Sequence, residues 1–364
     1  MSCEFGKNLR VSIFGQSHSE AIGAVIDGLP SGYAVDLAAV QAFADRRRAN
    51  GAISTARREA DTIRIVSGLF EGKTCGAPLC ALIENGDVRS VDYDEIKFCP
   101  RPSHADFTSY EKYGFRDHRG GGHFSGRLTA PLCAAGGIAK QILNAYGIYA
   151  GAHVQRIKDV CDKAFDPVRV KKEDFAYPCD FPCLDEGAAE RMRGVILSAK
   201  SECDSVGGVV ECAVVGLPAG LGEPNFGGVE NVLSSNLFGI PAVKGVEFGN
   251  GFAAASLFGS ENNDPFEIED GEVKTAKNDA GGVNGGITNG MPLIFRAAFK
   301  PTASVFKEQD SVDLENGVGR RLLIKGRHDP CVAVRAVPVV ESVAYLTVLD
   351  LLLGAEKDKL NRGY

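Results

Sequence analysis

The sequence lacks the features that mark several large classes of protein. It contains no tryptophan and only 3 methionines among 364 residues, and its formal net charge is −7, so it has no excess of positive charge. Proteins that bind nucleic acid over a broad surface are usually basic, and we therefore predict no nucleic-acid partner. A local group of arginines can still hold a small anion inside an acidic protein, which leaves small anionic ligands open.

Long apolar runs and metal motifs are missing as well. Residues 1–15, MSCEFGKNLRVSIFG, do not resemble a secretion signal, and no segment approaches the length of a membrane span. The 11 cysteines are odd in number and scattered. The pair in CDFPC, residues 179–183, lacks the spacing and the second pair of a zinc site. We expect a cytoplasmic protein with reduced thiols, no membrane segment and no metal.

Glycine is abundant, with 44 residues, which indicates tight turns and close backbone contacts. The length predicts one domain over residues 1–364, or two pseudo-symmetric halves that share a core. GAVIDGLPSG (23–32) resembles ECAVVGLPAG (211–220), although a Gly-Leu-Pro turn is also simply a good strand ending. The segment 159–190 is rich in charge and proline, so we expect a surface excursion with little core of its own.

The hydrophobic pattern predicts strands and helices in alternation. Apolar runs predict strands at 10–15, 22–32 and 207–216. Helical spacing predicts helices at 36–49, 129–147, 187–200 and 338–354. Asp36 is the expected N-cap of the first of these helices. Thr129 is the expected N-cap of the second and Gly147 its expected end, and Gly354 is the expected end of the last.

Two common nucleotide-binding motifs are only approximated. GLFEGKT (68–74) is one residue too short for a phosphate-binding P-loop, and GNGFAA (249–254) lacks the third glycine of a dinucleotide fingerprint. Neither favours an NTPase or a Rossmann dehydrogenase.

The histidines are placed unusually. Of the 6, only His153 has an ordinary setting, and the others lie in turns rich in glycine, serine or arginine. Histidine titrates near neutral pH and can donate a proton where lysine or arginine cannot. Arginines share these turns, and their planar fork suits phosphate and carboxylate. The pattern predicts a small polyanion held by arginines and acted on by histidines.

Two glycine-rich segments indicate two ligands. In RDHRGGGHFSGRLTAP (116–131), glycines 120–122 allow backbone N–H groups to approach a ligand. Ser125, Arg127 and the start of the helix near Thr129 add donors for a phosphate. A second such segment, 278–304, ends in KPTAS with Lys300, Thr302 and Ser304 as donors. We therefore expect a substrate and a phosphorylated cofactor.

These motifs, taken in order, resemble the chorismate synthase family along nearly the whole chain. GQSHS (15–19) stands for the family's Gly-Glu-Ser-His-Gly, and RPSHAD (101–106) for its Arg-Pro-Gly-His-Ala-Asp. VKGVEFGNGF, GGVNGGITNGMP, KPTAS and GRHDPCVAVRAVPVVES complete the order. Each motif is weak alone, but the ordered set is highly specific.

The resemblance implies an activity and a fold. The activity is the anti-1,4-elimination of phosphate and the C6 proton from 5-enolpyruvylshikimate 3-phosphate, which gives chorismate and requires reduced FMN (FMNH2). The implied fold class is α+β, a single-domain β-α-β sandwich with helices between antiparallel sheets. A homotetramer is implied as well. Because nothing in the sequence marks a nicotinamide site, we expect an external reductase to supply the NADPH-derived electrons.

The resemblance also assigns residues. His18 matches the acid thought to protonate the departing phosphate. His104 matches the histidine that stabilises reduced flavin. Asp329 matches the carboxylate that helps flavin N5 accept the C6 proton. The matching substrate-binding positions are Ser17, Arg47, Arg101, Ser125, Arg127 and Arg327. The matching flavin-binding positions are His123, Phe124, Ser125, Ala242, Gly285, Lys300, Pro301, Thr302, Ala303, Ser304 and Arg327.

Several positions depart from the family pattern and affect the expected flavin contacts and one phosphate contact. They are Gln16, Ser19, Ala52, Ser103, His123, Phe124, Leu128 and Pro241. The proposed proton-handling residues are retained. Two alternatives are a flavin-binding protein that has lost the lyase activity and a flavin-dependent oxidoreductase that uses a nicotinamide nucleotide itself.

Overall fold

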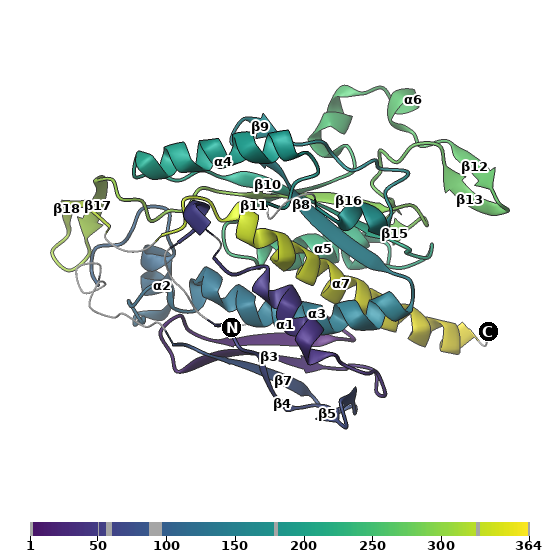
Figure 1. The fold of residues 1–364 in the computed structure, drawn as a ribbon, viewed down its shortest axis with the longest axis horizontal. Helices are drawn as coiled ribbons and strands as arrows, with labels where there is room; N and C mark the ends of the chain where they lie inside the picture. Colours follow the sequence, from purple (N-terminus) through teal and green to yellow (C-terminus); the bar gives the residue numbers. More distant parts are fainter. Residues whose placement is uncertain are drawn as a thin grey trace.

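Two antiparallel sheets enclose a layer of helices (Figure 1). The computed structural model describes residues 3–49, 51–55, 60–86, 97–177, 181–324 and 328–362. Helices α1 and α3 pack together below α7, and α7 packs on the second sheet and on α5. This arrangement is the predicted α+β sandwich, with the main hydrophobic core inside the helical layer and on the inner faces of both sheets.

The first sheet is built from the N-terminal part of the chain. Its order is β1 (Glu4–Phe5), β2 (Arg10–Gly15), β3 (Ala21–Asp27), β7 (Leu79–Glu84) and β4 (Arg64–Ser67). The prediction of β2 is confirmed, whereas the strand predicted over 22–32 ends at Asp27. Gly28 has φ +90°, and a Cβ there would lie 2.2 Å from the carbonyl oxygen of Asn8, so the chain turns away from the sheet at this glycine.

The second sheet is covered on both faces. Its order is β11 (Val243–Phe248), β16 (Leu293–Phe299), β10 (Gly208–Val215), β8 (Tyr149–Ile157) and β9 (Val160–Cys161). β10 matches the strand predicted over 207–216 and is buried along most of its length, because helices cover one face and α4 (Glu186–Ser201) with the preceding segment covers the other. The segment 159–190 buries Phe165 and Val170 against Ala213, so it contributes a small core of its own.

The central helices follow the predicted pattern with shifted ends. They are α1 (Leu37–Asp45), α3 (Thr129–Ala145), α5 (Val229–Phe238) and α7 (Ala333–Arg362). Asp36 caps α1 as predicted, accepting hydrogen bonds from the N–H groups of Ala38 and Ala39. Helix α1 ends earlier than the predicted residue 49, because the N–H groups of Arg46, Arg47 and Arg48 each bond a carbonyl three residues back and tighten the last turn.

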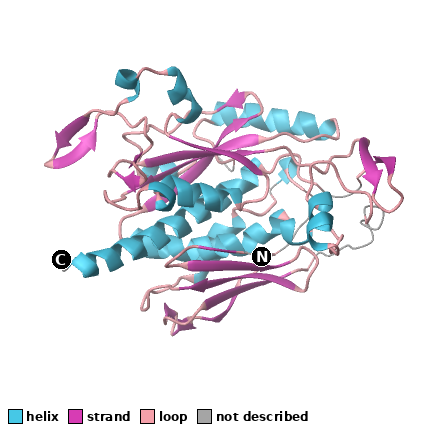
Figure 2. Cartoon of the chain, turned by 180° about the vertical axis from the view of Figure 1, so that it is seen from behind, coloured by secondary structure: helices cyan, strands magenta, loops and turns pink. Residues whose placement is uncertain are grey.

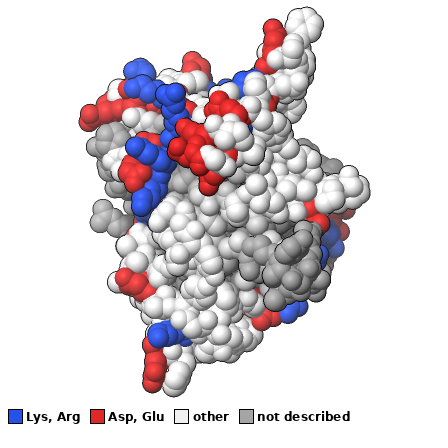
Figure 3. All heavy atoms as spheres, turned by 90° about the vertical axis from the view of Figure 1, so that its right-hand side faces the viewer, with Lys and Arg blue, Asp and Glu red and all other residues white. Residues whose placement is uncertain are grey.

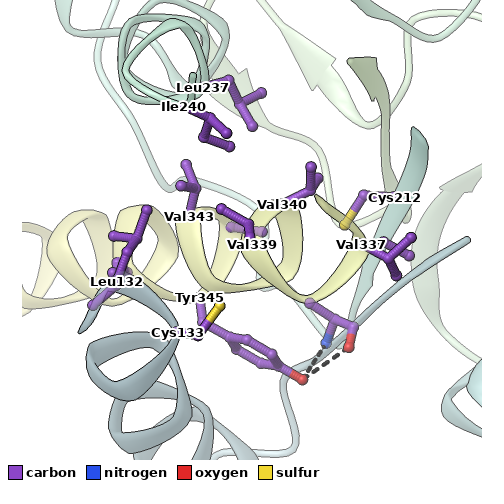
Figure 4. Packing of buried hydrophobic residues seen from close by; sticks show 14 of the residues in the cluster. Leu132, Cys133, Cys212, Leu237, Ile240, Val337, Val339, Val340, Val343 and Tyr345 are labelled. Carbon is purple, nitrogen blue, oxygen red and sulfur yellow. Dashed lines mark hydrogen bonds between the residues drawn. The ribbon is translucent and has the colours of Figure 1, made fainter. Parts of the chain in front are cut away.

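Helix α7 is longer than predicted. It begins at Ala333 and continues beyond Gly354, where the sequence predicted its end. Gly354 serves a close contact instead, because a Cβ there would lie 2.9 Å from Nδ2 of Asn8. The expectation of no span-length apolar segment is wrong: Ala333–Ala355 is long and apolar enough, but it is mostly buried inside the protein (Figure 4). There the Tyr345 hydroxyl donates to the carbonyl of Ala150.

The two halves of the chain repeat one order of elements. The main elements of the first half follow the chain order β2, β3, α1, β4, β7, α3. Those of the second half follow the order β8, β10, α5, β11, β16, α7, and equivalent strands have equivalent neighbours in the two sheets. Gly216 ends β10 as Gly28 ends β3: its φ is +79°, and a Cβ there would lie 2.2 Å from the carbonyl oxygen of Gly147. The similar turns at 23–32 and 211–220 therefore occupy equivalent places.

Smaller elements project from this sandwich. Hairpins β12–β13 (Phe266–Glu269 and Glu272–Thr275) and β17–β18 (Gln309–Asp313 and Val318–Leu322) extend at opposite ends of the molecule (Figure 2). The incomplete P-loop stretch 68–74 forms hairpin β5–β6 (Leu69–Phe70 and Lys73–Thr74). Helix α2 (Asp106–Tyr113) lies near β17–β18 and contributes to the site described below.

His153, expected in an ordinary setting, is fully buried on β8 between two carboxylates. Its Nδ1 lies 3.0 Å from Oδ2 of Asp162 and its Nε2 lies 3.0 Å from Oε2 of Glu211. Burial alone would lower the pKa of His153, but these hydrogen bonds outweigh it and raise the pKa above its ordinary value. Arg296, 3.4 Å from the other oxygen of Glu211, extends the charged row.

This raised pKa predicts that the protein loses stability as the pH rises above neutrality. The stabilisation is complete below the unfolded-state pKa of about 6.5 and is lost as the pH rises through the folded-state value, about 1.4 kcal/mol for each unit between the two. Urea unfolding between about pH 6 and pH 9 measures this loss. The variant His153→Gln should show a flatter profile, and equal profiles for the two proteins would contradict the prediction.

Candidate active site

A cavity of about 530 Å³ opens where helices of both halves end. Residues at the N-terminal ends of α3 and α7 and just beyond the C-terminal ends of α1 and α5 line it. The positive ends of two helix dipoles therefore meet at one cavity. The predicted site residues among its lining are Ser17, His18, Arg47, Arg101, His104, Phe124, Ser125, Arg127, Ala242, Lys300, Pro301, Thr302, Ala303, Ser304 and Asp329.

Three predicted residues are not placed in this cavity. His123 lines a separate cavity beside β2, and its ring packs on Phe124 with centroids 4.1 Å apart. Gly285 lies in the turn between β14 (Val283–Asn284) and β15 (Ile287–Thr288), at the opposite end of the molecule from α2 (Figure 1). Arg327 lies outside the described residues. Sequence proximity to a glycine-rich motif does not determine which side of a turn faces a ligand.

His18 lies in the turn between β2 and β3, at the wall of the cavity. Its Nδ1 is 3.0 Å from Oγ of Ser17, and the N–H of Ser17 donates to the carbonyl of Gly122 at 3.0 Å. A Cβ at Gly120 would lie 2.6 Å from the His18 ring, so only glycine fits there. Gly120 thus lets the chain pack closely against this histidine.

His104 is oriented by a buried carboxylate at the start of α2. Asp106 Oδ1 lies 2.9 Å from Nδ1 of His104, and both Asp106 oxygens accept hydrogen bonds from Arg101, at 2.7 and 2.9 Å. Burial opposes ionisation of Asp106, but the hydrogen bonds from Arg101 and His104 outweigh it and hold its pKa well below its usual range. Asp106 and Arg101 both contact Nδ1 of His104, which leaves Nε2 as the ring nitrogen that these two side chains do not contact.

The start of α3 differs from its prediction. Thr129 is not the cap, because a short 3-10 turn (Gly126–Leu128) leads directly into the helix. Ser125 caps that turn instead, accepting a hydrogen bond from the N–H of Arg127 at 3.2 Å. The Thr129 hydroxyl donates to the carbonyl of Gly126 and accepts from Nε of Arg47, at 2.6 and 2.5 Å. This contact ties the end of α1 to the start of α3.

Arg47 and Arg127 are buried cations at this junction. Only 5% of the surface of each residue is exposed, and Asp61 forms ion pairs with both. Burial is the main cause that lowers the pKa of Arg47 to about 10, with repulsion from Arg335 and Arg127 adding to it and Asp61 opposing it. Arg47 remains protonated at neutral pH, so the cavity keeps its positive charge.

The KPTAS segment forms the opposite wall. Oγ1 of Thr302 is buried and has no hydrogen-bond partner within the described part of the chain. Ala242 has φ +76°, which is unusual for a residue with a Cβ, and its carbonyl accepts the N–H of Lys300 at 3.0 Å. A hydroxyl without a partner beside a constrained backbone fits a polar ligand at this wall.

Asp329 is fixed by two donors. Its Oδ1 accepts the N–H of Thr55 at 2.8 Å, and its Oδ2 pairs with Arg335. Nε of Arg335 donates to the carbonyl of Arg47 at 2.9 Å, so one side chain joins the start of α7 to the end of α1. The carboxylate therefore has a single orientation at the cavity wall.

Sequence reasoning missed three residues of this site, namely Asp61, Asp106 and Arg335. Asp106 and Arg335 lie inside the motifs RPSHAD and GRHDPCVAVRAVPVVES, so a signal was present. Asp61 has no such signal, because its role depends on two arginines distant in sequence. Among the described residues, no three histidine, cysteine, aspartate or glutamate side chains form a group that could hold a metal ion.

Comparisons with known proteins agree with this geometry. The family model for chorismate synthase matches residues 9–353. Chorismate synthases of Lancefieldella parvula and Methanosarcina barkeri are each 45% identical to this chain, covering 97% and 96% of it and 96% and 95% of their own lengths. A crystal structure of chorismate synthase superposes with a TM-score of 0.73 at 27% identity and covers 96% of this chain and 93% of its own. The chain belongs to the chorismate synthase family.

Proposed function

We propose that this protein is the lyase that converts 5-enolpyruvylshikimate 3-phosphate to chorismate, using reduced FMN. The observation that carries the proposal is one cavity lined by His18, His104 and Asp329 together with arginines of the first half and the KPTAS wall of the second. A phosphorylated polyanion and a phosphorylated cofactor account for both the cations and the polar wall.

The substrate phosphate belongs with the arginines. Arg47, Arg101 and Arg127 are buried cations with fixed hydrogen bonds, so they need little reorganisation as negative charge develops on the departing phosphate. His18 lies at the same cavity and is the residue that would donate a proton to that phosphate. An acid and a set of cations together make the dianion a better leaving group.

The residues on the other wall fit a flavin phosphate and ring. The buried hydroxyl of Thr302, the ammonium of Lys300 and the constrained backbone at Ala242 would hold FMN. Reduced FMN, when bound, supplies electron density and the acceptor for the C6 proton. His104, oriented by Asp106, would hold a proton at Nε2 toward a reduced, negatively charged ring, and Asp329 would orient groups near the proton acceptor.

Assembly, location and electron supply complete the proposal. A homotetramer is supported by large apolar side chains exposed on the projecting segment 251–276, among them Phe252, Phe258, Phe266 and Ile268. The end of the molecule that carries this segment also has a broad surface with few charges below its charged upper edge (Figure 3). We propose a cytoplasmic enzyme that receives reduced FMN from an external NADPH-dependent reductase.

An anaerobic assay tests the function. With dithionite-reduced FMN, the protein should convert 5-enolpyruvylshikimate 3-phosphate to chorismate and release one phosphate per chorismate, and oxidised FMN should give no product. Flavin binding without phosphate release would instead identify a flavin-binding protein that has lost the lyase activity. Bleaching of bound FMN by NADPH alone would show that the protein reduces its own flavin and contradict the external reductase.

A further inference from the structure

Asp61 is a buried carboxylate that lines the cavity and has no assigned role. It precedes β4 in a segment without regular structure, and only 6% of its surface is exposed. Its φ of +48° is in the left-handed region, which aspartate and asparagine tolerate better than most residues. A charged group in such a position needs a compensating partner.

The Asp61 carboxylate pairs with two arginines of the described residues that line the same cavity. Its Oδ1 pairs with Nη1 of Arg127, and its Oδ2 lies 3.5 Å from Nη1 of Arg47. The two arginines are 80 positions apart in sequence, at the end of α1 and just before α3. One carboxylate therefore sets the spacing between two cations that come from different elements.

Neutral oxygens also accept hydrogen bonds from each guanidinium. Nη2 of Arg47 donates to the carbonyl of Gly126 at 2.6 Å, and Nε of Arg127 donates to Oδ1 of Asn85 at 3.0 Å. These acceptors direct the guanidinium groups but do not cancel their charge. The group of Arg47, Arg127 and Asp61 thus has a net charge of +1, where the two arginines alone would have +2.

We propose that Asp61 is a positioning residue and an internal counter-ion, which holds Arg47 and Arg127 together in the free protein and limits their affinity for phosphate. The inference rests on the proposed function for the identity of the anion. A phosphate bound to both arginines lies close to the Asp61 carboxylate, and like charges repel more strongly in a buried site than in water. This repulsion lets the site release the phosphate product instead of retaining it.

The variant Asp61→Asn tests both parts of the inference, because asparagine keeps the shape and tolerates the positive φ. Without flavin and in phosphate-free buffer, its Tm should fall by about 5 °C or more, since two buried arginines lose their carboxylate. Inorganic phosphate should restore its Tm, and the Kd for inorganic phosphate, measured by calorimetry, should be about tenfold lower than in the unaltered protein.

The matched control is Glu341→Gln. Glu341 is an equally buried carboxylate that pairs with Arg46, the neighbour of Arg47, but it does not line the cavity. This variant should also lose stability, and phosphate should raise its Tm no more than that of the unaltered protein. Equal recovery of the two variants by phosphate, or an unchanged phosphate Kd in Asp61→Asn, would overturn the inference.

Turnover separates a role in product release from a merely structural one. In the assay described above, Asp61→Asn should show stronger inhibition by inorganic phosphate, with an inhibition constant about tenfold lower and a reduced kcat. If the unaltered protein forms no chorismate but Asp61→Asn still binds phosphate more tightly, the counter-ion role stands and the proposed function fails. If chorismate forms and the phosphate affinities are equal, the counter-ion role fails alone.

A second variant covers the case in which Asp61→Asn does not fold. Combining Asp61→Asn with Arg127→Gln leaves Arg47 as the only cation of the three and returns the net charge to +1. This double variant should be soluble and should have a higher Tm in phosphate-free buffer than Asp61→Asn. A double variant that is insoluble both with and without phosphate would overturn the assignment of Asp61 as a counter-ion.

Discussion

Replacing His18 with alanine is expected to lower kcat for chorismate formation by about 10²–10⁴-fold, the usual contribution of a positioned general acid. The phosphate would then leave without a proton donor, although the arginines would still bind it. His18 lies in the cavity wall, where its ring contacts Oγ of Ser17 and is approached closely by Gly120, so alanine removes the expected proton donor from the cavity.

Stopped-flow measurement of chorismate absorbance under anaerobic conditions checks this loss, with FMN affinity measured in parallel. His118→Ala is the matched control, because His118 lies in the same glycine-rich stretch but does not line the cavity. The control should retain turnover within a few-fold. Equal turnover in His18→Ala and the unaltered protein would remove His18 from the mechanism.

Replacing Glu341 with glutamine is expected to lower the free energy of unfolding by about 2–4 kcal/mol. Glu341 lies inside α7 and its two oxygens receive Nη1 and Nη2 of Arg46 at 2.5 and 2.9 Å. One of them also accepts the N–H of Ala152 on β8 at 3.0 Å. Removal of one partner of a buried pair costs about 3–5 kcal/mol, and the partial exposure of the Arg46 side chain reduces that figure here.

Urea unfolding at pH 7 measures this loss in the unaltered protein and in two variants. The second variant, Asp27→Asn, removes the exposed pair between Asp27 and Arg10 on the first sheet and should cost less than about 1 kcal/mol. A Glu341→Gln variant no less stable than Asp27→Asn would show that this buried pair does not link α7, α1 and β8.

The strands and helices were predictable where the pattern was local. Asp36 caps α1 by accepting a hydrogen bond from a residue two positions along the chain. The apolar run of β10 predicts a strand whichever elements cover it. The end of α7 was not predictable. Glycine has a low helix propensity, which predicts a helix end at Gly354, but this glycine lies inside the helix where the Asn8 side chain comes close to it. The N–H groups of Lys7, Asn8 and Leu9 all donate to the Asp350 side chain, so this part of α7 is attached to a segment far from it in sequence.

The candidate site was predictable to the extent that motifs carry single residues. His18, His104 and Asp329 were predicted because each lies in a short family motif, and the structure brings them to one cavity. Asp61 was not found, because a counter-ion is defined by its partners and these come from other elements. His123 and Gly285 show the converse, since both lie in recognisable motifs and neither lines the cavity.

The repeated order of elements has a consequence for which residues each half of the chain contributes to the cavity. The predicted substrate-binding residues that line the cavity all precede Gly147, whereas Ala242, the KPTAS segment and Asp329 all follow it. Two halves with the same order of elements thus present unlike side chains to one cavity: in the proposed function, the first supplies the arginines for the phosphate ester and the second supplies the KPTAS wall for the cofactor. Neither half is a smaller version of the whole, because the two share an order of elements but not the side chains that line the cavity.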